Sequence, residues 1–131
     1  MSQLVLPDAP LPRRLLAPSW RRRPPSRRLC AVAATLTAAA FALPVGELIA
    51  SSRRSAYTAF ARQCAMYLAH VSFGLSYSEV ARGFGRDRTT AAHACRLVEE
   101  RRDDAAVEAV LGSLEQASAA LHCRLGAQVQ S

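Results

Sequence analysis

Residues 76–102, with the sequence SYSEVARGFGRDRTTAAHACRLVEERR, decide the fold of this 131-residue chain. Ser76 precedes Glu79 by three positions, which is typical of a capping box at the start of a helix. Gly83 and Gly85 follow, and glycine permits a sharp bend because it has no Cβ. The stretch therefore predicts a short helix, a tight turn and a longer second helix, which is the layout of a helix-turn-helix.

The second helix of this pair is expected to span residues 87–102. Asp87 is its predicted N-cap, because a carboxylate accepts hydrogen bonds from the first turn and suits the positive end of the helix dipole. The inner face is predicted to consist of small apolar residues at helical spacing: Ala91, Ala94, Cys95 and Val98, with Leu97 beside them. We interpret the last four residues, EERR at 99–102, as a solvated end.

The outer face of the second helix carries groups that suit DNA. A helix-turn-helix places its second helix in the major groove. Arginine can bond guanine through a fork of donors, and threonine offers a hydroxyl together with a methyl group for thymine. We therefore expect Arg88, Thr89, Thr90 and His93 to face bases. The alternative is an ordinary helical hairpin with a basic surface.

Three blocks of sequence resemble the C-terminal DNA-binding domain of DnaA, the bacterial chromosomal replication initiator. Residues 62–69, RQCAMYLA, resemble the family's R-Q-x-A-M-Y-L-A helix, and residues 75–80, LSYSEV, resemble L-S-x-x-E-I. Residues 86–94, RDRTTAAHA, resemble R-D-H-T-T-V-x-H-A, the signature at the recognition helix. The blocks occur in the family's order and at nearly its spacing, so the match is specific.

This resemblance implies an all-α, Trp-repressor-like bundle over residues 29–125 that binds double-stranded DNA. It implies phosphate contacts from five arginines: Arg53, Arg54, Arg62, Arg86 and Arg96. The implied function is the reading of DnaA-box-like sites to regulate replication initiation or transcription, with the replication initiator or other replication proteins as further partners. The protein is expected to be a monomer or weak dimer. The alternative is a helical interaction module that has lost specific DNA binding and acts through a partner or dimer face.

The chain departs from the family pattern at three places. Phe60 stands where the family often has a second arginine that reaches the minor groove, so a lower affinity is expected. The turn before Arg86 is one residue shorter, which could change how the second helix enters the groove. Arg88 replaces the family's histidine and brings a permanent charge with five donors. We therefore expect a target site related to the family's but not identical to it.

The basic charge is concentrated at the N-terminus. Residues 1–28 hold seven arginines, one aspartate and six of the seven prolines, a composition that disfavours helix and sheet. Residues 29–131 hold ten arginines and nine acidic residues. We expect a disordered arm at 1–28 that adds salt-sensitive phosphate affinity, or a tail with no role. DNA binding by the folded part must then come from local clustering.

The remaining segments predict a bundle of helices. An apolar run at residues 29–43 is expected to be a buried helix with Leu29, Val32, Leu36 and Phe41 on one face; an export signal is the alternative. Residues 51–73 predict a long central helix or helix pair with a core stripe of Tyr57, Phe60, Cys64, Leu68 and Val71. Residues 103–125 predict a final helix with a stripe of Val107, Val110, Leu111, Leu114, Leu121 and Leu125, and residues 126–131 are expected to fray.

The sequence offers little for catalysis or metal binding. The four cysteines at 30, 64, 95 and 123 show no C-x-x-C pair, which suits small buried hydrophobes in a reducing cytoplasm. No G-x-x-x-x-G-K-[ST] loop is present to hold ATP phosphates. We therefore expect neither an enzyme nor a cofactor nor a metal, and a cytoplasmic protein associated with the nucleoid.

Overall fold

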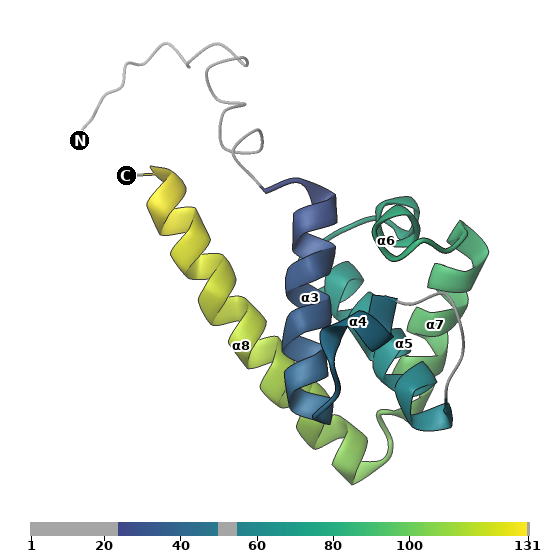
Figure 1. Ribbon diagram of the computed structural model, residues 1–131. Helices are drawn as coiled ribbons and strands as arrows, with labels where there is room; N and C mark the ends of the chain where they lie inside the picture. The colour runs from purple at the N-terminus through teal and green to yellow at the C-terminus, as the bar shows by residue number, and fades with distance from the viewer. Residues whose placement is uncertain (1–23, 50–54, 131) are drawn as a thin grey trace.

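The computed structural model describes residues 24–49 and 55–130, and this part of the chain is helical without any strand. Its elements are α3 (Ser26–Phe41), α4 (Val45–Ile49), α5 (Ala56–Val71), α6 (Tyr77–Phe84), α7 (Arg88–Arg101) and α8 (Ala105–Gln130). Figure 1 shows α3 and α5 at the centre, with α6 and α7 on one side and α8 on the other. Every helix of this bundle borders one continuous apolar core. The expected all-α bundle is confirmed.

Helix α3 begins earlier than expected and buries its smallest residues. It starts at Ser26 rather than residue 29, so the end of the predicted N-terminal arm is helical. Ala33 and Ala34 are fully buried, whereas Val32 and Leu36, which were predicted for the core face, are only partly buried against the core. Leu29 and Phe41 are buried as predicted. Between them the helix packs through short side chains, and alanine lets neighbouring helices approach closely.

Helix α5 supplies the middle of the core. Cys64 and Leu68 are fully buried, as the predicted stripe requires. The two ends of that stripe were wrong, because Tyr57 is 55% exposed and Val71 is 49% exposed. Tyr57 nonetheless fastens α5 to α3, since its hydroxyl donates a 2.7 Å hydrogen bond to the carbonyl oxygen of Phe41.

The two glycines of the predicted turn have different roles. Gly85 has a φ of 66°, a left-handed conformation that glycine adopts without strain, and it ends α6. Gly83 is helical and lies against α3, where a Cβ would come within 2.3 Å of Cys30 Sγ. The prediction that both glycines make the bend was therefore wrong for Gly83. This residue allows α6 to pack closely on α3.

Helix α8 is longer than expected. It continues to Gln130, whereas the sequence predicted an end at Leu125 followed by frayed residues. Leu111 and Leu114 are buried in the core, and Val107 and Val110 pack partly against it, as the predicted stripe requires. None of the helices in residues 24–49 and 55–130 combines the length and the apolar character needed to cross a membrane.

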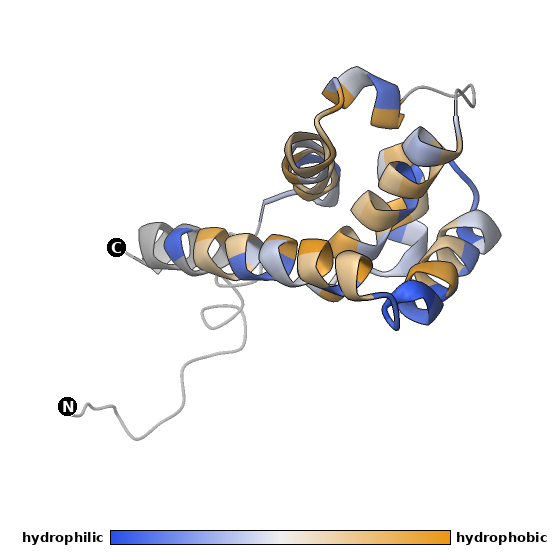
Figure 2. Cartoon of the chain, turned by 90° about the horizontal axis from the view of Figure 1, so that it is seen from below, coloured by the Kyte–Doolittle hydropathy of each residue, from blue (hydrophilic) through white to orange (hydrophobic). Residues whose placement is uncertain are grey.

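The end of α7 is exposed at Glu99, Glu100 and Arg101, as predicted, but the prediction of a solvated end was wrong for Arg102. The Arg102 side chain is only 18% exposed, and it forms salt bridges of 2.7 Å with both Glu108 and Glu115 of α8. It also donates a 3.0 Å hydrogen bond to the Tyr67 hydroxyl, which in turn donates to Glu99. Figure 2 shows this junction of α7 and α8 as a strongly hydrophilic region. The junction is a polar network that ties α5, α7 and α8 together.

Candidate nucleic-acid interface

The start of α6 is fixed by a complete capping box, as predicted. Ser76 Oγ accepts a 3.1 Å hydrogen bond from the backbone N–H of Glu79, and Glu79 Oε1 accepts a 2.9 Å bond from the backbone N–H of Ser76. Val80 and Phe84 are buried on the inner face of this short helix. Both ends of α6 are thus defined, by the box at one end and by Gly85 at the other.

The start of α7 is fixed by Asp87, the predicted N-cap. Its Oδ1 accepts a 2.7 Å hydrogen bond from the backbone N–H of Thr90. This bond favours the charged carboxylate and holds the pKa of Asp87 below its ordinary value of 3.8. The predicted inner face is confirmed, since Ala91, Ala94, Cys95 and Val98 are all buried. Because that face is inward, the opposite face of α7 meets solvent.

The four residues predicted to face bases lie together on the outer side of α7. Arg88, Thr89, Thr90 and His93 are all exposed, within the first two turns of the helix. Arg96 is exposed one turn further along. Their geometry is compatible with groove docking, while their contacts with DNA remain predictions.

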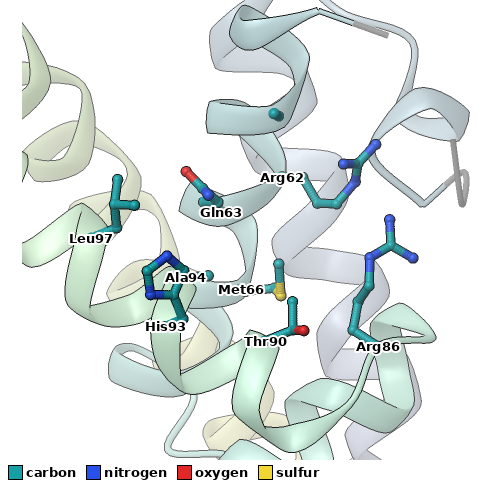
Figure 3. Close-up of a pocket in the computed structure, with 9 residues that line it drawn as sticks. Arg62, Gln63, Met66, Arg86, Thr90, His93, Ala94 and Leu97 are labelled. Atoms are coloured by element: carbon teal, nitrogen blue, oxygen red, sulfur yellow. The ribbon is translucent and has the colours of Figure 1, made fainter. Parts of the chain in front are cut away.

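A groove of about 480 Å³ runs between α5 and the outer face of α7. Its walls include Gln63 and Met66 of α5, Thr90 and His93 of α7, and Arg86 of the turn. Figure 3 shows that the Arg86 guanidinium points to the same side of the groove as that of Arg62. The first and third sequence blocks of the resemblance, residues 62–69 and 86–94, therefore border one surface.

Arg62 was predicted to contact DNA, and the structure places it mostly inside the fold. It is 5% exposed, its Nε donates a 3.0 Å bond to the Leu48 carbonyl oxygen, and its Nη2 donates a 3.1 Å bond to that of Glu47. These carbonyls lie in the last turn of α4, so Arg62 anchors this helix to α5. Arg53 and Arg54, which follow α4, lie outside the described residues.

Phe60, the residue that departs from the family pattern, belongs to the edge of the core. Its ring centroid lies 6.1 Å from that of Phe41 in an edge-to-face arrangement. The guanidinium carbon of Arg101 lies 4.9 Å from the Phe60 centroid. The ring thus joins α3, α5 and the end of α7, which gives the substitution a packing role.

Two residues beside Arg88 were missed by the sequence analysis. The guanidinium carbon of Arg88 lies 5.7 Å from the ring centroid of Tyr77, which stacks on the ring of His70 at 4.3 Å. An aromatic residue in the first turn of α6 was the available signal, but its register against α7 could not be read from spacing.

A second basic surface also went unnoticed. Arg27 and Arg28 of α3 and Arg82 of α6 line a hollow of about 580 Å³ beside Gly83. The sequence predicted that Arg27 and Arg28 belong to a disordered arm. Arg82 was given no role, because nothing in its sequence spacing indicated that it lies near α3.

Three of the four cysteines, Cys30, Cys64 and Cys95, are buried free thiols. Burial raises the pKa of Cys30 to about 11, that of Cys64 to about 12 and that of Cys95 to about 11. Such thiols stay protonated near neutral pH and behave as small apolar groups. Within the described residues, no group of three His, Cys, Asp or Glu side chains is placed to hold a metal ion.

Comparisons with known proteins agree with this geometry. Residues 33–98, half of the chain, match the family model of the bacterial dnaA protein helix-turn-helix. A solved structure described as the crystal structure of a DNA replication initiation factor aligns with a TM-score of 0.65 and 30% sequence identity. The alignment covers 79% of this chain but only 31% of that chain. None of the curated proteins matches. The chain belongs to the bacterial DnaA helix-turn-helix family, a family of DNA-binding domains.

Proposed function

We propose that the chain binds double-stranded DNA at DnaA-box-like sites through the first two turns of α7. The observation that carries the proposal is the shared exposure of Arg88, Thr89, Thr90 and His93 on one side of a helix whose start is fixed by Asp87. A major groove admits an α-helix, and base edges are read there by side chains of these types. A rigid, capped helix holds such side chains in register with successive bases.

Each side chain has a distinct role in this proposal. Arg88 bonds guanine through its fork, Thr89 and Thr90 meet a thymine methyl or a base edge, and His93 reads a base one turn along. Arg86, just before α7, and Arg96, within α7, hold phosphates. Phosphate contacts set the register of the protein on the duplex, whereas the base contacts supply the sequence preference.

The charge distribution supports a division of labour between two parts of the chain. Residues 29–131 carry nearly balanced charge, and the excess of arginine lies in residues 1–28, of which Arg27 and Arg28 belong to α3. In the proposal, the N-terminal segment adds affinity for any DNA, and that affinity falls steeply with salt. The specific part of binding then comes from α7 and persists at higher salt.

The biological role proposed here is regulation at sites shared with a replication initiator. The chain aligns with about a third of the replication initiation factor structure. A protein that occupies such sites would compete with an initiator there. It would also act on transcription where the sites lie near promoters. We place this activity in the cytoplasm, on the nucleoid.

The test is a titration of the full chain against a duplex that carries a DnaA-type box and against a scrambled duplex of equal length, at two salt concentrations. The proposal predicts tighter binding to the box and a preference that survives the higher salt. Equal binding to both duplexes that collapses with salt would contradict base readout. A selection from random duplexes would then separate a different DNA target from a partner-binding module.

Arg88→Ala and Arg96→Ala form a matched pair for the same titration. Arg88→Ala removes a base contact, so it lowers the affinity for the box and reduces the difference in affinity between the box and the scrambled duplex. Arg96→Ala removes a phosphate contact, so it weakens binding to both duplexes equally. It also reduces the slope of log affinity against log salt concentration by roughly 1. Identical behaviour of the two variants would count against the roles assigned to them.

A further inference from the structure

The guanidinium of Arg88 lies near an aromatic ring, although the side chain is exposed. Its central carbon is 5.7 Å from the centroid of the Tyr77 ring, within the range of a cation–π contact. Arg86, Arg88 and Arg96 are the three arginines proposed to meet DNA in and around α7. Of these, Arg88 is the one whose guanidinium lies near the ring of Tyr77. This contact restricts where the head group of Arg88 lies before DNA arrives.

The Tyr77 ring is itself backed by a second ring. His70, near the end of α5, stacks on Tyr77 with a centroid distance of 4.3 Å and an interplanar angle of 24°. His70 Nδ1 lies 2.7 Å from the carbonyl oxygen of Leu75. A carbonyl can only accept, so Nδ1 is the donor and the hydrogen bond fixes the plane of the imidazole. The backbone between α5 and α6 thereby orients both rings.

The stacked rings of Tyr77 and His70 form a platform for Arg88, and the position of Tyr77 makes this platform rigid. Tyr77 is the first residue of α6, directly after the capping-box residue Ser76, and its ring is half-buried against the core. The platform therefore joins three elements in a row: His70 from α5, Tyr77 from α6 and Arg88 from α7. It acts at the residue where this chain has arginine and the family pattern has histidine.

We propose that Tyr77, backed by His70, is a positioning residue that holds Arg88 ready to read one guanine in the DNA site. This inference rests on the proposed function and adds the determinant of specificity at a single base pair. An exposed arginine otherwise loses side-chain freedom when it docks, and an arginine already held against a ring loses less. Tyr77 acts through Arg88 and makes no contribution to phosphate binding.

The experiment begins by selecting the preferred duplex of the wild-type chain from a random pool. The base pair read by Arg88 is then the one at which Arg88→Ala loses discrimination. Tyr77→Leu removes the ring, and Tyr77→Phe is the matched control that keeps the ring without its hydroxyl. Each variant is titrated against the selected duplex and its single-base-pair substitutions, after circular dichroism establishes that its helix content and unfolding midpoint match the wild type.

We expect Tyr77→Leu to lose about two- to fivefold in discrimination at that one base pair, the size of an exposed cation–π contact. Discrimination elsewhere and the salt slope stay unchanged, and Tyr77→Phe behaves as the wild type. In an Arg88→Ala background, Tyr77→Leu has no further effect on discrimination. A ring that only supports the fold would not produce this dependence on Arg88.

Three results would overturn the inference. Unchanged discrimination in Tyr77→Leu would mean that Arg88 needs no platform, and higher affinity in that variant would mean that Tyr77 draws Arg88 away from DNA. An equal loss at every base pair would assign Tyr77 a structural role. These outcomes leave the proposed function intact, because the wild type still selects a site. Failure of the wild type to select any sequence would instead overturn the proposed function and the inference with it.

Discussion

The two ends of α7 use arginine in opposite ways. At the first end, Arg88 is exposed and its recorded contact is the ring of Tyr77, which leaves its five donors available. At the last end, Arg102 is mostly covered, and its donors are spent on Glu108, Glu115 and Tyr67. One helix thus carries an arginine suited to an external acceptor and an arginine committed to the fold. The arrangement of neighbouring acceptors decides which role an arginine takes.

The acidic residues follow the same division. The described part of α7 has acidic side chains only in its second half, and α8 brings two more to that end. At the first end, Asp87 turns its carboxylate to the backbone of Thr90. DNA is repelled by carboxylates and attracted by free cations, so the first end is the one suited to DNA.

Removal of the committed arginine is expected to have the largest effect on stability. Arg102→Met keeps the apolar stem but leaves Glu108 and Glu115 without their cation, and we expect the free energy of unfolding to fall by about 2–3 kcal/mol. The loss stays below that of a fully buried pair because both carboxylates are partly exposed. Urea denaturation measures it. Arg96→Met, an exposed change on the same helix, is the control and should shift stability by less than about 0.5 kcal/mol.

Removal of the available arginine is expected to affect binding instead. Arg88→Ala should cost about 2 kcal/mol in discrimination for the selected duplex, because a bidentate contact with guanine is lost. Its unfolding midpoint should fall much less than that of Arg102→Met, since Arg88 is exposed and the variant loses a cation–π contact with Tyr77 rather than two salt bridges. Binding titrations and thermal unfolding of the same preparation separate the two effects. If Arg88→Ala instead lost stability and kept its discrimination between duplexes, Arg88 would be an arginine committed to the fold and not one available to DNA.

The close packing under the helix-turn-helix gives a smaller effect. Gly83→Ala places a Cβ within 2.3 Å of Cys30 Sγ, and overpacking of about 1–3 kcal/mol outweighs a gain in helix propensity of up to about 1 kcal/mol. We expect a net loss of about 1 kcal/mol in the free energy of unfolding.

Gly112→Ala is the matched control for that change. A Cβ at this position of α8 meets nothing within 4 Å, so the same substitution should stabilise by up to about 1 kcal/mol. Equal changes in the free energy of unfolding of Gly83→Ala and Gly112→Ala would contradict the close approach of α6 and α3. Binding to DNA should be unchanged in Gly112→Ala.

The smallest effect concerns the cap at the first end of α7. The pKa of Asp87 is lowered in the folded state by the Thr90 N–H, so the charged carboxylate contributes stability that is present above pH 3.8 and lost as the pH falls through the lowered value. Asp87→Asn keeps a good N-cap without a titrating group. We expect the unfolding midpoint of the wild type to decline more than that of the variant below about pH 4. If the unfolding midpoints of the wild type and the variant changed in parallel with pH, the carboxylate charge would not contribute to stability.

The sequence predicts the first end of α7 well because its determinants are local. The capping box, the N-cap and the inner face are separated by three or four residues, and helix geometry alone places them. The residues proposed to contact bases, which lie between Arg88 and His93, follow from the same spacing. No contact with a distant segment is needed to expose them.

The role of Arg102 at the last end of α7 could not be predicted because several of its partners come from far along the chain. Arg102 meets Glu115 of α8 and Tyr67 of α5, and no periodicity relates these residues. The same holds for Gly83, whose close neighbour is Cys30, and for Arg62, which binds the carbonyls of α4. Each was assigned a local or external role because its true neighbour was more than ten residues away.

The most direct test of the central claim is a residue-resolved NMR titration of the chain with its selected duplex. The account predicts large chemical-shift changes at the amides of Thr89, Thr90 and His93 and at the Nε–H of Arg88. The Nε–H of Arg102 should stay in place, because its acceptors are within the fold. Shifts confined to the Arg102 end or to α8, with the first turns of α7 unmoved, would contradict the account.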